Sequence, residues 1–323
     1  MSGAMNTAKV VCIIFTGVTL AACGGGGGVS STPAPAPAPA PAPTPTPTPT
    51  PVAFTDWQSV PANGSVRLTG STTEGTYNRT TAGQFGEVSS YNTPVAGAAT
   101  VDLTYSAGSQ TGVRVAGAQS SITFSNTDGS TNTRLAANPN VIRRASPSGA
   151  SSLLLFDAPS AGYSHLSFGA WTGRSDTTGY IGAFHAGTLT PDSSIPTSGS
   201  ATFNGSSVGY YSSINGAVET VISDVTLTAN FSSRSISYNA SNAQGSISLP
   251  GLNITGTLTW NAGSNLFTGT LRTPVGFGTG ELAGPASGRF YGPNSKEVGG
   301  SFVLNWAGGT RAQYIGAFGA KRP

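Results

Sequence analysis

Cysteine and charge are both scarce in this chain of 323 residues. Its two cysteines, Cys12 and Cys23, both lie near the N-terminus, so no disulfide is available to stabilise the rest of the chain. Lys, Arg, Asp and Glu together make up only 8% of the residues, and the formal net charge is +3. Surface helices usually carry many charged side chains, so this composition argues against a helical fold. It also argues against a nucleic-acid-binding protein, which would need a dense basic surface.

The start of the chain has the layout of a bacterial lipoprotein signal. Lys9 precedes an apolar stretch from Val10 to Leu20, and Ala21-Ala22-Cys23 closes it. A helix needs about 20 apolar residues to cross a bilayer, so this shorter stretch predicts a cleaved signal peptide over residues 1–22. The two alanines give a signal peptidase access to the backbone, and Cys23 is the predicted lipidation site. We therefore expect a mature protein that begins at Cys23 and is anchored in a membrane by lipid.

Residues 23–52 predict an extended tether between the lipid and the folded protein. Five glycines, Gly24–Gly28, are followed by Pro-Ala and Pro-Thr repeats from Pro33 to Pro51. Such repeats favour polyproline II, which rises about 3.1 Å per residue and could hold the next domain roughly 60 Å from the membrane. Gly24 stands where an aspartate would act as an inner-membrane retention signal. We therefore expect the outer membrane as the location.

After the tether, the sequence predicts an all-β protein. Thr, Val, Tyr, Phe and Trp recur in short runs that Gly, Asn, Ser and Asp interrupt. The alternation is clearest at residues 225–231, 254–260 and 302–306, where every second side chain is apolar and would face a core. About eight such runs follow His165. An antiparallel set of that number can close into a β-barrel, which leaves no exposed sheet edge.

The sequence between the tether and the predicted barrel is also rich in strands, but its alternation is less regular. Leu153–Phe156 is a continuous apolar run of strand length, and Asp157-Ala158-Pro159 ends it. We predict a smaller β-rich, handle-like domain over residues 53–163 and an eight-stranded antiparallel β-barrel over residues 164–323. A single larger sandwich is the alternative. The segment Tyr180–Phe184 recurs as Tyr314–Phe318, which is typical of strands in similar barrel environments.

Several segments of the second half resemble one known family. In chain order they are Phe168-Gly169-Ala170-Trp171, Gly187-Thr188-Leu189-Thr190-Pro191, the run from Pro196 to Gly205, the run from Gly288 to Asn294, the run from Glu297 to Phe302, and the run from Gly316 to Arg322. Together they look like the β-barrel domain of transferrin-binding protein B and its relatives. Members of this family are surface lipoproteins of Gram-negative bacteria, whose lobes pair a handle domain with an eight-stranded barrel. They capture transferrin, haem, haemoglobin or a complement regulator.

The resemblance and the lipid signal together predict the function. They imply an outer-membrane-anchored lipoprotein at the cell surface that binds an extracellular ligand, with iron or haem acquisition as one purpose. The implied partners are the membrane, through the lipid anchor, a host or environmental protein that carries iron or haem, and a TonB-dependent receptor. A structural or adhesive envelope lipoprotein without a small-molecule ligand is the alternative.

The sequence offers few residues for chemistry, and we predict neither an enzyme nor a cofactor or metal site. His165 and His185 are the only two histidines, so they are the candidate axial ligands if the protein binds haem. The segment Gly205-Ser206-Ser207-Val208-Gly209 matches the nucleophile elbow of hydrolases. That elbow needs a helix after the serine, whereas here the sequence continues as a strand, so we interpret it as part of the barrel.

One further segment predicts a structural corner. In Tyr291-Gly292-Pro293-Asn294 the glycine frees the backbone and the proline fixes φ at the start of a turn. Glu297 follows closely. We expect its carboxylate to cap backbone amides at this corner, and contact with a ligand is the alternative.

Overall fold

The computed structural model describes residues 51–79, 88–91, 95–213, 218–246, 248–274, 280–306 and 312–323. As predicted, these residues fold almost entirely as strands. The helices among them are short 3₁₀ turns, namely η1 (Asp192–Ser194), η2 (Pro250–Leu252) and η3 (Pro293–Ser295). In the described part of the chain, no helix has the length and apolar character needed to cross a membrane. The predicted signal peptide, the predicted lipidation site Cys23 and nearly all of the predicted tether lie outside the described residues.

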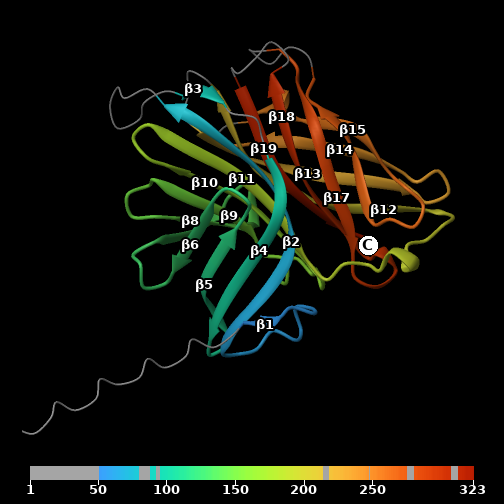
Figure 1. Cartoon of the computed structure of the whole chain (residues 1–323), viewed down its shortest axis with the longest axis horizontal. Helices are drawn as coiled ribbons and strands as arrows, with labels where there is room; N and C mark the ends of the chain where they lie inside the picture. Colours follow the sequence, from blue (N-terminus) through green and yellow to red (C-terminus); the bar gives the residue numbers. More distant parts are fainter. Residues whose placement is uncertain are drawn as a thin grey trace, which may run out of the picture. The chain divides into compact units, whose positions relative to one another are not determined.

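The first sheet contains eleven strands and curls as a half barrel, which we call the handle (Figure 1). Its strand order is β6-β5-β4-β2-β11-β10-β9-β8-β7, and β1 and β3 each pair with β2. All pairs are antiparallel except β1 with β2. The strands are β1 (Val52–Ala53), β2 (Gly64–Arg79), β3 (Val88–Tyr91), β4 (Val95–Ser106), β5 (Ser109–Ala116), β6 (Ser121–Ser125), β7 (Thr131–Leu135), β8 (Asn138–Ala145), β9 (Ser151–Phe156), β10 (Leu166–Arg174) and β11 (Thr178–Gly187).

The following eight strands close into an antiparallel barrel, which confirms the predicted fold class. Each strand pairs with the next along the chain, and β12 pairs with β19 to complete the ring. Alternate side chains fill the barrel with aromatic and aliphatic groups, as the period of two requires. The strands are β12 (Ser200–Ser213), β13 (Val218–Asn230), β14 (Ser235–Gln244), β15 (Ile254–Trp260), β16 (Leu266–Arg272), β17 (Leu282–Tyr291), β18 (Glu297–Trp306) and β19 (Ala312–Lys321).

The barrel begins at Ser200 and not at residue 164, because β10 and β11 belong to the handle sheet. Both strands are buried on both faces. One face carries Trp171 and Phe184 into the handle core, while the other carries Phe168 and Ile181 into a second core against the barrel wall. Burial on both sides removes the polar alternation that marks a sheet face. Nothing local in the sequence therefore shows which sheet these strands join.

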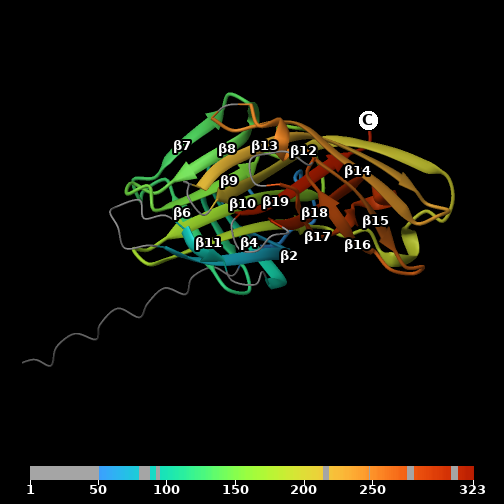
Figure 2. The ribbon, with the colours of Figure 1, turned by 90° about the horizontal axis from the view of Figure 1, so that it is seen from above.

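Two hairpins with the same aromatic pattern pack together where handle and barrel meet. The hairpin of β10 and β11 lies beside β18 and β19 (Figure 2). Trp171 stands opposite Gly182 in the first hairpin, and Phe302 stands opposite Gly316 in the second. A Cβ atom at Gly182 would lie 2.2 Å from the Trp171 ring, and one at Gly316 would lie 2.5 Å from the Phe302 ring. The repeated Tyr-Ile-Gly-Ala-Phe segment thus has one packing role in two sheets, and only its second copy is in the barrel.

Candidate functional site

The two histidines predicted as candidate ligands meet the same corner of the barrel, at the end of β17. His185 reaches across from β11, and its Nδ1 lies 2.6 Å from the hydroxyl of Tyr291. His165 precedes β10 and packs on Gly292, where a Cβ atom would lie 2.3 Å from the imidazole Cδ2. We call this contact between the start of β10, the end of β11 and residues 291–297 the seam.

His185 is sealed inside the seam. Its side chain is 1% exposed, and its Nε2 is buried without a hydrogen-bond partner. Burial lowers the pKa of His185 to about 3, with a smaller contribution from the positive charge of Arg289. The imidazole is therefore neutral at physiological pH. An iron atom could reach Nε2 only if the handle moved away from the barrel.

His165 is half-buried and lies at the margin of the seam. Its Nδ1 is 3.4 Å from the carbonyl oxygen of Thr55, so the ring is held between the start of the handle and the barrel corner. The structure brings the two histidines to adjacent positions of one corner but gives them different surroundings. Their assignment as haem ligands stays a hypothesis.

Glu297 fastens the start of β10 to the barrel. Its side chain is completely buried, and its carboxylate accepts hydrogen bonds from the backbone N–H of Ser164 at 2.5 Å and of His165 at 3.0 Å. Burial raises the pKa of Glu297, and the two amide donors oppose that shift. The predicted capping of amides is confirmed. The amides come from the segment that enters the handle strand, however, and not from the turn at residues 291–294.

Other buried or half-buried side chains bridge handle and barrel by hydrogen bonds. They are Thr73 with Ser301 at 2.9 Å, Ser152 with Tyr210 at 3.0 Å, Asn138 with Ser206 at 3.0 Å, and Tyr163 with the carbonyl of Gly319 at 2.9 Å. Buried hydrogen bonds require correct geometry from both partners, so they fix one docking arrangement of handle on barrel. In the described ranges, no three His, Cys, Asp or Glu side chains are grouped to hold a metal ion.

The segment Gly205–Gly209 lies within β12 and is paired on both sides, with β13 and β19. Its interpretation as barrel strand is confirmed. The hydroxyl of Ser207 is buried and lies close to the phenol groups of Tyr238 and Tyr314, but it makes no hydrogen bond of good geometry. Burial raises the pKa of both tyrosines. This serine therefore has no base beside it and no route to solvent.

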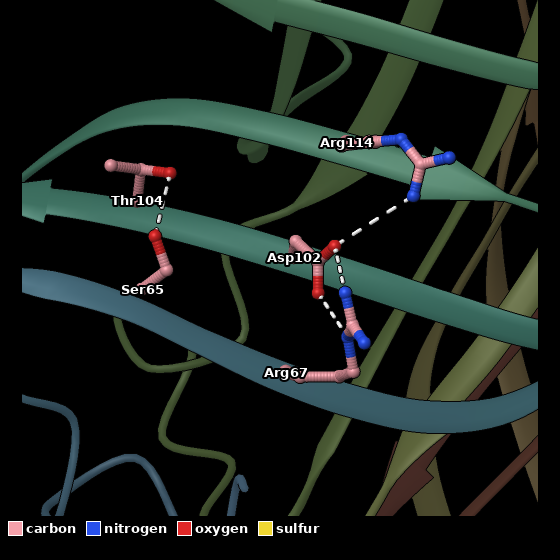
Figure 3. Close-up of polar contacts among 5 residues, drawn as sticks. All are labelled: Ser65, Arg67, Asp102, Thr104 and Arg114. Atoms are coloured by element: carbon pink, nitrogen blue, oxygen red, sulfur yellow. Dashed lines mark hydrogen bonds and ion pairs between the residues drawn. The ribbon is translucent and has the colours of Figure 1, made fainter. Parts of the chain in front are cut away.

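An ion-pair ladder crosses the outer face of the handle (Figure 3). The guanidinium of Arg67 on β2 donates to both carboxylate oxygens of Asp102 on β4, at 2.6 Å and 2.8 Å. Arg114 on β5 approaches the same carboxylate at 3.8 Å. The arginine side chains are 44% and 47% exposed, so solvent screens both ion pairs and they stabilise the fold little. Sequence reasoning missed this ladder, because the three residues become neighbours only through the strand register.

Comparison with known proteins identifies the barrel. Residues 195–322 match the family described as C-lobe and N-lobe beta barrels of Tf-binding protein B, and they contain all eight barrel strands. The predicted resemblance is confirmed for this part of the chain. No curated protein matches the sequence.

Solved structures of transferrin-binding protein B are similar to this chain. A point mutant of transferrin-binding protein B from Haemophilus parasuis is 12% identical, with a TM-score of 0.41 over 80% of this chain and 76% of that one. Isotype 1 transferrin-binding protein B from serogroup B Neisseria meningitidis is 13% identical, with a TM-score of 0.41 over 80% of this chain and 77% of that one.

Proposed function

We propose that this protein, whose barrel is of the transferrin-binding protein B type, is a lipid-anchored surface protein that binds an extracellular ligand. The observation that carries the proposal is the family match of residues 195–322. We further propose that the protein takes part in the acquisition of iron or haem. The ligand is then a protein that carries iron or haem, and a TonB-dependent receptor receives the cargo.

The N-terminal sequence supports the proposed location. The run Leu20-Ala21-Ala22-Cys23 supplies a lipidation signal, and the glycine and proline repeats after it supply a long tether. A tether of this kind would hold the folded part away from the lipid surface, where large ligands can approach it. We therefore place the protein on the outer membrane, facing outward.

The geometry supports a binding role over an enzymatic one. His185 and Glu297 are both buried in the seam and take part in docking the handle on the barrel. Polar groups committed to such contacts are not free to transfer protons to a substrate. A rigid two-sheet scaffold with exposed loops is suited to presenting a binding surface.

Intact cells that express the full chain provide the test. Labelled transferrin, haemoglobin and haem are offered separately, and saturable binding of at least one is expected. Protease treatment of the intact cells should abolish that binding, and Cys23→Ser should remove the protein from the cell surface. The proposal is overturned if no probe binds and the folded part resists protease until the cells are lysed. A structural or adhesive envelope protein predicts surface exposure without any saturable ligand.

Direct binding of haem can be tested separately by absorption spectroscopy. Haem added to the purified full chain should give a Soret band, and His165→Ala or His185→Ala should shift or abolish it. Circular dichroism of each variant checks that the sheets remain folded. A Soret band unchanged in both variants would reject the histidines as ligands while leaving surface binding intact.

A further inference from the structure

One end of the barrel carries a pocket that the proposed function does not use. Its volume is about 200 Å³, and it lies between η1, the turn 231–234 after β13 and the turn 261–264 after β15. The rings of Phe231 and Trp260 form one wall, edge to face with their centroids 6.0 Å apart, and Ile195 adds an aliphatic surface. The inner wall is therefore apolar and aromatic, as in small-molecule sites.

Arg234 stands at this pocket in an unusual backbone conformation. Its φ is 53°, in the left-handed region that favours glycine or asparagine. Its side chain is exposed and lines the pocket. The ion pairs found among the described residues do not include it. Glycine would suit this turn better, so the turn alone does not explain an arginine here. Backbone outliers of this kind occur preferentially at functional sites.

The charges around the pocket favour an anion. Arg322 lies over the rings of Phe203 and Phe231, at 5.3 Å and 5.5 Å from their centroids, so a second cation stands next to the aromatic wall. The nearest carboxylate in the pocket lining is that of Asp192, whose Oδ1 already accepts the backbone N–H of Asn265 at 2.9 Å. Arg234 therefore supplies the guanidinium in the pocket lining, Arg322 adds positive charge at the ring of Phe231, and the carboxylate of Asp192 is partly engaged.

We propose that this pocket binds a small organic anion with an aromatic body. The carboxylate of the ligand pairs with Arg234, whose planar donors match the two oxygens. The ring of the ligand packs against Phe231 and Trp260. The pocket is smaller than the about 300–1,000 Å³ of sites for drug-sized ligands, which limits the ligand to the size of phenylacetate. This site goes beyond the proposed capture of an extracellular protein and does not depend on it.

The test uses phenylacetate and its neutral analogue benzyl alcohol with the full chain in detergent. Saturation-transfer NMR reports ligand binding, and tryptophan fluorescence reports the environment of Trp260. Phenylacetate should bind saturably and better than benzyl alcohol. Arg234→Gln should weaken phenylacetate binding about five- to ten-fold while leaving benzyl alcohol binding unchanged, because it removes a charge-assisted hydrogen bond. Arg234→Lys keeps the charge but loses the planar pair of donors, so its affinity for phenylacetate should lie between those of the wild type and Arg234→Gln.

Two further variants separate ligand binding from the folding of the turn. Arg234→Gly suits the left-handed backbone, so it should keep or raise the melting temperature and still lose affinity for phenylacetate. Arg114→Gln removes the same charge from the handle and should leave the affinity unchanged. Equal affinity of the wild type and Arg234→Gln for phenylacetate overturns the proposal. So does fluorescence quenching that persists unchanged in Trp260→Phe, because the ligand then sits elsewhere.

Discussion

The buried imidazole of His185 should make the folded state sensitive to acid. Its pKa is about 3 in the folded protein, against about 6.5 in an unfolded chain. Because the folded-state pKa is the lower one, the unfolded chain takes up a proton first as the pH falls. The stabilising effect of the neutral group is therefore complete above pH ~6.5 and is lost at about 1.4 kcal/mol per pH unit below it. From pH 7 to pH 4.5 this histidine alone should lower the free energy of unfolding by about 2.5 kcal/mol.

A double variant isolates this contribution. His185→Phe alone would leave the hydroxyl of Tyr291 buried without its partner, at a cost of about 1–3 kcal/mol. His185→Phe combined with Tyr291→Phe removes both polar groups together. Urea unfolding at pH 7 and pH 4.5 should show that the wild type loses about 2.5 kcal/mol more than the double variant. His165→Gln, at the margin of the seam, should keep the acid sensitivity of the wild type. Equal acid losses in wild type and double variant would refute the reasoning.

Three substitutions test other parts of the packing, each by urea unfolding at pH 7. Gly182→Ala places a Cβ atom 2.2 Å from the Trp171 ring, which is fully buried and cannot swing aside, so a loss of about 3 kcal/mol is expected. Glu74→Gln replaces a buried carboxylate that accepts the backbone N–H groups of residues 118–120, and about 2 kcal/mol should be lost. Arg144 is 5% exposed, and two nitrogens of its guanidinium lack a hydrogen-bond partner. Arg144→Met removes this buried charge, so the free energy of unfolding should rise by about 1 kcal/mol. A decrease would show that the charge is compensated in the folded protein.

The barrel was predictable because its signal is local. Strands such as β15 alternate threonine with apolar residues, and the turn at residues 261–264 that joins β15 to β16 contains Asn261 and Gly263, which are typical turn residues. The count of about eight runs and the family resemblance agreed on the number of barrel strands. The handle was predicted only as a β-rich region, and β10 and β11 were placed in the wrong sheet, because both of their faces are buried.

The candidate sites were less predictable, because their residues are distant in the sequence. Glu297 meets amides 132 and 133 positions away, so its capping role was predictable but its partners were not. Arg234 gave no sequence signal at all. An arginine in a polar turn is ordinary until the backbone shows its φ of 53° and the pocket beside it.

The sequence by itself predicts the lipid signal and the tether and determined the strand-forming character of the chain, because each depends on residues that are neighbours along it. Only the tertiary structure decided which strands form the handle and which form the barrel. It also decided that His185 is sealed and that Arg234 borders a pocket. Burial, strand register and charge proximity are set by contacts between distant segments, and a local pattern of side chains does not contain them.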